Sequence, residues 1–113
     1  MRLTVVGCGD AFGSGGRSNT CYRLETGGIT ATLDFGASAP VGLHKLGLSA
    51  ADIDLIFLSH LHGDHFGGLP FLLLDGQFVD RRAKPLLIVG PPGTRARLDA
   101  AMEVLFPRMG ENA

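Results

Sequence analysis

Two short apolar runs constrain the fold of this 113-residue chain more than any other feature. They are residues 53–59 (IDLIFLS) and 85–90 (PLLIVG), and runs of this length and composition are typical of strands buried on both faces of a sheet. Residues 69–79 and 93–106 have helical character, and in the second segment the apolar residues recur every three or four positions. Strands that alternate with helices predict the α/β class, with helices covering at least one face of a sheet.

The N-terminal part of the chain is rich in strand-forming residues. Residues 2–6 predict a strand, which runs into a loop rich in glycine and serine. Residues 20–26 and 29–35 predict an antiparallel hairpin, because Gly27-Gly28 between them suits a tight turn with positive φ. Residues 40–48 predict a short helix weakened by glycines, and Thr94 is expected to cap the last helix. We expect residues 1–113 to form a single domain.

Composition and charge exclude several classes of protein. The chain is 45% apolar, which is enough for a real core, and its formal net charge of −1 disfavours a broad surface that grips nucleic acid. No apolar stretch approaches the roughly 18 residues that a membrane-spanning helix needs, and the N-terminus lacks the apolar segment of a secretory signal. We therefore expect a cytoplasmic protein that does not contact a membrane, with Cys8 and Cys21 reduced and buried.

The sequence LSHLHGDHFGG, residues 58–68, contains three of the chain's four histidines. His60 and His62 are two residues apart, so in an extended segment both side chains point to the same side and can share a metal ion. Asp64 and His65 follow Gly63, whose lack of a Cβ lets the backbone turn sharply, so this second pair can form a neighbouring half-site. The pattern predicts two adjacent metal positions at the end of a strand, where ligands collect in α/β sheets.

The ligand types favour zinc, with manganese or iron as alternatives, because calcium and magnesium prefer oxygen ligands. Two ions at this separation suit hydrolysis, in which Asp64 can orient the attacking water as well as bind metal. The alternatives are an exposed polar loop or a single structural zinc site, although structural zinc sites more often use cysteine. His44 precedes the motif and is interpreted as a partly exposed helix residue.

The motif HLHGDH, preceded by IDLIFLS and followed by FGGLP, resembles the second signature of the metallo-β-lactamase superfamily. TLDFG at residues 32–36 resembles the first signature, which implies that Asp34 supports the metal loop. The opening VVGCGDAFGSGGRSNTCYRLE and the later IVGPPGT are most similar to the branch that contains ribonuclease Z, cyclic-nucleotide phosphodiesterases and arylsulfatase-like enzymes. The resemblance implies an αββα sandwich of two sheets flanked by helices.

The resemblance covers only part of the expected ligand set. In the superfamily, further histidines and a bridging aspartate follow the motif, but this chain has no histidine after His65. The family fold is built from two αβ halves, so we expect this chain to supply the N-terminal αβ half. We therefore expect the chain alone to be inactive, and to form a homodimer or to associate with the missing C-terminal half.

The branch resemblance implies a metal-dependent hydrolase of phosphodiester bonds, in a small molecule or in RNA. Arg17 and Asn19, in the loop of residues 7–19, are candidates for binding the anionic substrate, since a guanidinium suits phosphate oxygens. The alternatives are a thioester or lactone hydrolase, and a fragment or binding module of the same fold that performs no catalysis.

Overall fold

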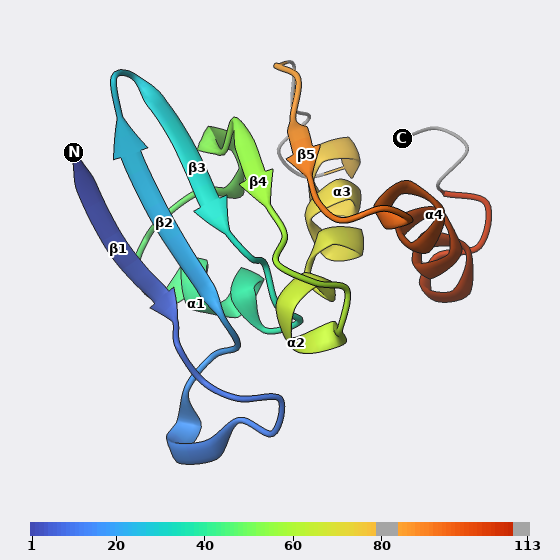
Figure 1. The fold of residues 1–113 in the computed structure, drawn as a ribbon, viewed down its shortest axis with the longest axis horizontal. Helices are drawn as coiled ribbons and strands as arrows, with labels where there is room; N and C mark the ends of the chain where they lie inside the picture. The colour runs from blue at the N-terminus through green and yellow to red at the C-terminus, as the bar shows by residue number, and fades with distance from the viewer. Residues whose placement is uncertain (79–83, 110–113) are drawn as a thin grey trace.

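A computed structural model describes residues 1–78 and 84–109, and it consists of one five-stranded sheet with helices packed against it (Figure 1). The strands are β1 (Arg2–Gly7), β2 (Cys21–Thr26), β3 (Ile29–Leu33), β4 (Leu55–Phe57) and β5 (Leu87–Val89). Their order in the sheet is the order in the sequence: β1, β2 and β3 are antiparallel, whereas β3, β4 and β5 are parallel. The predicted α/β class is confirmed.

The hairpin forms where the glycine pair predicted it. Gly27 and Gly28 have φ of 56° and 79°, and β2 pairs with β3 on either side of them. Such positive φ values at both central residues give the turn the twist that flanking strands need, and only glycine adopts them without steric cost. The turn therefore helps to determine the register of these two strands.

The described part of the chain also contains four α-helices and two 3₁₀ turns: α1 (Ala39–Lys45), α2 (Gly63–Phe66), α3 (Leu69–Phe78), α4 (Thr94–Leu105), η1 (Ser14–Gly16) and η2 (Ala50–Asp52). Helix α1 is shorter than the expected 40–48, because the chain turns at Gly47 with a left-handed φ of 68°. The prediction of a helix over 69–79 agrees with α3 up to Phe78, and Val79 lies outside the described residues. Among the described residues, no helix is both long and apolar enough to cross a membrane.

The expected cap of the last helix is wrong. Gly93, with a φ of 90°, precedes the first turn of α4, and Thr94 is already inside the helix. The Thr94 hydroxyl donates a hydrogen bond of 2.6 Å to the carbonyl oxygen of Pro91. This hydrogen bond links the first residue of α4 to the turn that precedes the helix.

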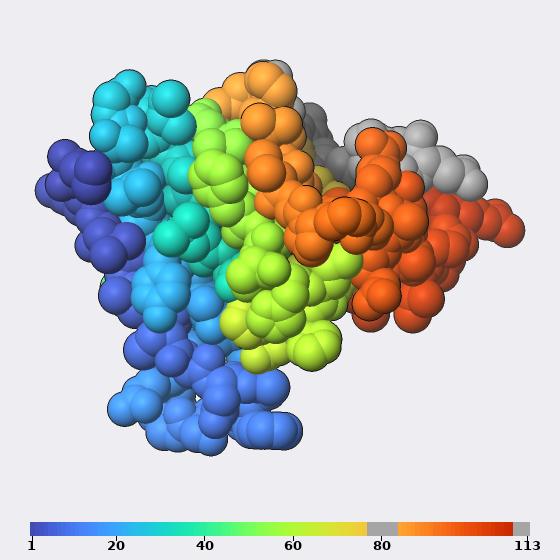
Figure 2. Space-filling view, viewed as in Figure 1, coloured from blue at the N-terminus to red at the C-terminus, as the bar shows by residue number. Residues whose placement is uncertain are grey.

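The two faces of the sheet differ sharply. Ile56 and Thr32 are fully buried on the face that the helices cover, in a core that includes Phe35, Leu43 and Leu69. The strand pairing places twelve residues on the opposite face, all of them except Thr26 apolar or aromatic: Leu3, Val5, Tyr22, Leu24, Thr26, Ile29, Ala31, Leu33, Leu55, Phe57, Leu87 and Val89. We call this set the open face; Figure 2 shows its strands side by side.

The residues of β4 and β5 suit burial on both sides of the sheet, but the described residues cover only one side. Leu87 is 60% exposed and Phe57 is 41% exposed, although both belong to the predicted apolar runs. An apolar run at a sheet position indicates that both faces suit burial, but it does not indicate that the chain itself supplies both covers.

Candidate metal centre

The histidine motif lies between the end of β4 and the start of α3. His60 follows the strand, and His62 is still extended, with φ −74° and ψ 151°, immediately before α2. Asp64 and His65 lie within the single turn of α2. A helical turn that begins at Gly63, directly after an extended segment, therefore brings the four side chains together.

The motif side chains form one compact group. Ligand atoms of His60, His62 and Asp64 all lie within 4.8 Å of one another. The ring centroid of His65 lies 3.9 Å from that of His60, and its Nε2 lies 3.3 Å from Oδ2 of Asp64. The spacing predicted two separate pairs, whereas the structure places the Asp64 carboxylate beside both the histidines that precede it and His65.

Asp34 forms hydrogen bonds to this group. It follows β3 in the left-handed region, with φ 63°, and it is only 6% exposed. Its carboxylate accepts hydrogen bonds from the backbone N–H of Ser59 at 2.7 Å, from the Ser59 hydroxyl at 2.8 Å and from Nδ1 of His65 at 2.7 Å. These bonds are what a residue that supports the metal loop needs.

Ser59 extends the network to a second histidine, a link that the sequence did not reveal. Its Oγ lies 2.8 Å from the Asp34 carboxylate and 3.0 Å from Nδ1 of His60. Because an ionised carboxylate only accepts hydrogen bonds, the serine hydroxyl donates to Asp34 and accepts from Nδ1–H of His60. The only sequence signal for this role is a hydroxyl residue directly before the first histidine.

The same reasoning assigns the tautomers of two histidines. Nδ1–H of His65 donates to Asp34, and Nδ1–H of His60 donates to Ser59. In the neutral form of each ring the lone pair is therefore on Nε2, which is the atom left for a metal ion. Neutral imidazoles with a neighbouring carboxylate are a ligand set that zinc, manganese and iron accept, so the residues present fit the expected metal.

The structure places Asn19 beneath the loop that carries it. It is 7% exposed, and its side-chain amide donates to the carbonyl oxygen of Asp10 at 2.8 Å and accepts from the N–H of Ser38 at 3.1 Å. The amide therefore links the loop of residues 8–20 to the N-terminal end of α1. Arg17 is exposed, and its guanidinium lies near Gly15 in the same loop.

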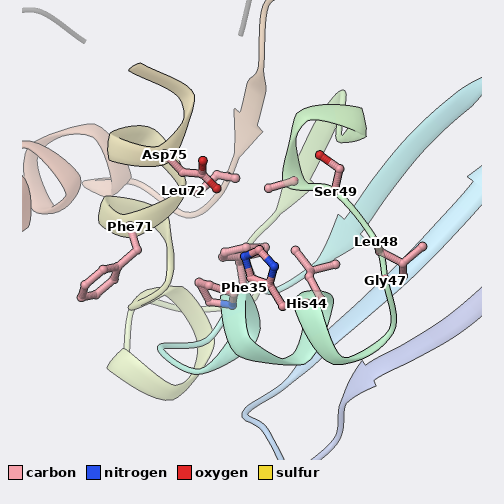
Figure 3. Close-up of a pocket in the computed structure, with 11 residues that line it drawn as sticks. Phe35, His44, Gly47, Leu48, Ser49, Phe71, Leu72 and Asp75 are labelled. Atoms are coloured by element: carbon pink, nitrogen blue, oxygen red, sulfur yellow. The ribbon is translucent and has the colours of Figure 1, made fainter. Parts of the chain in front are cut away.

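His44 lies away from the metal group, exposed on α1. It lines a hollow of about 460 Å³ between α1, the turn that follows it and α3 (Figure 3). Phe35, Leu43 and Leu72 contribute apolar walls, and none of the four motif residues lines this hollow. The hollow is therefore separate from the metal-binding group.

The cysteines differ from each other in exposure. Both are free, but Cys8 is exposed and Cys21 is buried, so the expectation of burial is wrong for Cys8. Burial, together with the nearby Asp34 carboxylate, raises the pKa of the Cys21 thiol to about 12.

Comparison with known proteins identifies the family. The sequence profile of the Anti-Pycsar protein Apyc1 family matches residues 1–98. The chain is 38% identical over 89 residues to the Anti-Pycsar protein Apyc1 of Paenibacillus sp. (strain J14), covering 79% of this chain and 36% of that protein. It is 36% identical over 105 residues to the ribonuclease Z of Ignicoccus hospitalis, covering 93% of this chain and 35% of that protein.

Solved structures agree with the fold. Human tRNase Z, short form, superposes with a TM-score of 0.78 and 36% identity, over 93% of this chain and 39% of that one. The metallo-beta-lactamase fold protein YhfI from Bacillus subtilis superposes with a TM-score of 0.68 and 26% identity, over 84% of this chain and 39% of that one. The chain thus spans little more than a third of the length of these relatives. It belongs to the Anti-Pycsar protein Apyc1 family and has a metallo-β-lactamase, ribonuclease Z-like fold.

Proposed function

We propose that the protein is a metal-dependent hydrolase of phosphodiester bonds, with the metal held by His60, His62, Asp64 and His65. The observation that carries the proposal is the compact donor group, whose ligand atoms at His60, His62 and Asp64 lie within 4.8 Å of one another. The hydrogen bonds from Nδ1 of His60 and His65 support it further, because they leave Nε2 of both rings available.

We propose zinc as the metal, in two positions, with manganese or iron as alternatives. Four motif side chains supply on average two ligands to each of two ions, whereas a catalytic zinc normally has about three protein ligands. The remaining ligands would come from polypeptide outside these 113 residues. On this proposal the present chain alone is inactive.

The chain's own residues have distinct parts in the reaction. When bound, the metal ions lower the pKa of water and stabilise negative charge on the scissile group. The Asp64 carboxylate accepts a hydrogen bond from the attacking water and orients it, which makes Asp64 the catalytic residue of this chain. Asp34 holds His65 directly and His60 through Ser59, so that neither ring rotates away. Arg17, exposed in the neighbouring loop, is proposed to contact the phosphate.

The proposed substrate is a phosphodiester in RNA or in a small molecule such as a cyclic nucleotide. The relatives named ribonuclease Z and tRNase Z act, by their names, on RNA, which supports this class. The net charge of −1 argues against a broad RNA-binding surface on this chain, so any RNA contact would have to be local. The cytoplasmic location expected from the sequence stays a prediction.

The experiment is a substrate panel with the full-length, zinc-loaded protein. Chromogenic phosphodiesters, aryl sulfates, thioesters and lactones are compared by kcat/KM, and we expect the phosphodiesters to be preferred. Preference for a thioester or a lactone would contradict the phosphodiester proposal and favour hydrolysis of that other class of substrate.

The rival function is a binding module of this fold that has lost catalysis. The completeness of the ligand set separates the two functions, because hydrolysis requires further histidines and a bridging aspartate beside the motif. If neither the full-length protein nor an associated polypeptide supplies them, the enzyme proposal fails.

The open face supports an associated polypeptide. Seven of its apolar side chains are more than 40% exposed: Leu3, Val5, Ile29, Leu33, Phe57, Leu87 and Val89. A contiguous apolar surface of this kind marks an interface or causes aggregation. We propose that the missing C-terminal half covers it, and that a second copy of the chain does so when that half is absent.

A further inference from the structure

The loop between β1 and β2 presents an unusually exposed aromatic side chain. Phe12 is 90% exposed, more than any other aromatic residue in the described part of the chain. The loop, residues 8–20, leaves the sheet at the same edge as the metal-binding motif, and Figure 1 shows it on the side of the molecule where α2 lies. An isolated exposed Phe is common on protein surfaces, so the surroundings of Phe12 decide whether it matters.

Hydrogen bonds hold the backbone around Phe12 in place. The Asp10 carboxylate accepts from the N–H groups of Phe12 at 3.0 Å and Ser14 at 3.1 Å. The pKa of Asp10 is lowered by hydrogen bonds from Ser14 and Phe12, so the carboxylate stays ionised and keeps these bonds at neutral pH. At the foot of the loop, the N–H of Gly9 donates to the carbonyl oxygen of Ser18 at 2.8 Å. Phe12 is therefore presented on an ordered loop.

The foot of the loop is in contact with the metal loop. Asn19, which donates to the Asp10 carbonyl oxygen, and the backbone of Asp64 both pack against Gly36, where a Cβ atom would collide with each of them. A continuous chain of contacts thus runs from Asp64 through Gly36 and Asn19 to the turn that carries Phe12. The loop of residues 8–20 and the metal centre therefore lie next to each other on the same side of the molecule.

We propose that Phe12 determines specificity by stacking on the nucleobase of a nucleotide phosphodiester at the rim of the metal centre. This inference rests on the proposed function. An aromatic ring on an ordered loop loses little conformational freedom on stacking, and base–aromatic stacking tolerates every base because each has a π-face. Phe12 has no polar atom with which to distinguish one base from another. It therefore selects for a planar ring beside the phosphate and not for a particular sequence.

The test compares two substrates that differ only in the base. Hydrolysis of a nucleoside 5′-methyl phosphodiester and of its abasic counterpart is measured in the full-length protein by phosphorus NMR. We expect Phe12→Ala to raise KM about tenfold for the nucleoside substrate, with kcat and the abasic substrate little changed. Phe12→Tyr should retain the low KM. As the control, Val104→Ala removes part of an apolar side chain that is 79% exposed on α4, and it should change neither substrate.

A binding measurement separates this inference from the proposed function. Equilibrium dialysis with a nucleoside monophosphate requires no hydrolysis, and Phe12→Ala should weaken its binding about tenfold. If no phosphodiester is cleaved but this loss occurs, the proposed function fails and the stacking role stands. Unchanged binding in Phe12→Ala, or an equal rise in KM for the nucleoside and abasic substrates, would overturn the role of Phe12.

Discussion

Replacing Asp34 with asparagine tests the support of the metal centre at its most constrained point. The change keeps the size of the side chain and removes its charge. The new amide oxygen can still accept from the Ser59 N–H, but the amide NH₂ would face two donors, the Ser59 hydroxyl and Nδ1–H of His65. Two hydrogen bonds at a residue that is 6% exposed are therefore lost.

The magnitude follows from those two bonds. The His65 ring is only 20% exposed, so its Nδ1–H left without an acceptor costs about 1–3 kcal/mol, whereas the exposed Ser59 hydroxyl can bond to water. Asp34→Asn should therefore lower the free energy of unfolding by roughly 1–3 kcal/mol. His60 and His65 also lose the contacts that fix their tautomers, and the loss of such supporting contacts typically lowers metal affinity about 10–100-fold. Zinc affinity, measured by competition with a chromophoric chelator, should fall within that range in the full-length protein.

A matched aspartate provides the control. The Asp54 carboxylate accepts from the Thr30 N–H at 2.9 Å and lies 2.9 Å from Nζ of Lys84, just before β4 and therefore at the end of that strand opposite the motif. Asp54→Asn should lower stability without changing zinc affinity. If Asp34→Asn does not fold, Ser59→Ala removes only the link to His60 and should still weaken zinc binding. Wild-type zinc affinity in a folded Asp34→Asn protein would refute the supporting role.

Three further predictions concern single side chains. In the full-length protein, His62→Ala should lose metal because it removes a ligand, whereas Asp64→Ala should retain at least one ion and lose most turnover. Metal analysis beside an activity assay distinguishes the two variants. Full activity in Asp64→Ala would show that the site is misassigned. Gly36→Ala should lower the unfolding free energy by about 1–3 kcal/mol, because the new methyl group collides with the Asp64 carbonyl oxygen. Chemical denaturation measures this change. Unchanged stability would mean that the loop containing Gly36 does not pack against the loop containing Asp64 as described. At pH 8, iodoacetamide should label exposed Cys8 and leave Cys21 unmodified in the native protein, because a thiol with a pKa of about 12 is almost entirely protonated there; mass spectrometry reads both sites, and equal labelling would contradict the burial of Cys21.

The sequence predicted those parts of the fold that local chemistry determines. The Gly27-Gly28 turn and the spacing of apolar residues in α4 depend on nearby residues, and both agree with the structure. The cap of α4 was misassigned because Gly93 can adopt a positive φ at the position that Thr94 was expected to fill. The exposure of β4 and β5 depends on whether another polypeptide covers the open face, which their composition does not encode.

For the site, the sequence indicated which side chains could bind a metal but not how they are held. The spacing of His60, His62, Asp64 and His65 suggested a group, and resemblance to a family pointed to Asp34. The role of Ser59 depends on a contact across 25 positions of the chain, and the burial of Asn19 depends on Ser38, 19 positions away. Long-range contacts of this kind become visible only in the folded structure.

The measurement that tests the central claim most directly is a zinc titration of the 113-residue chain by calorimetry, with its mass measured in parallel by light scattering. The claim is that this chain carries part of a dinuclear site and one sheet face that needs a cover. It predicts weak zinc binding, no phosphodiester turnover and a mass above that of the monomer. When Phe57 and Leu87 on the open face are replaced by polar residues, the measured mass should fall towards that of the monomer. A monomer that binds two zinc ions tightly and turns over substrate would contradict the claim.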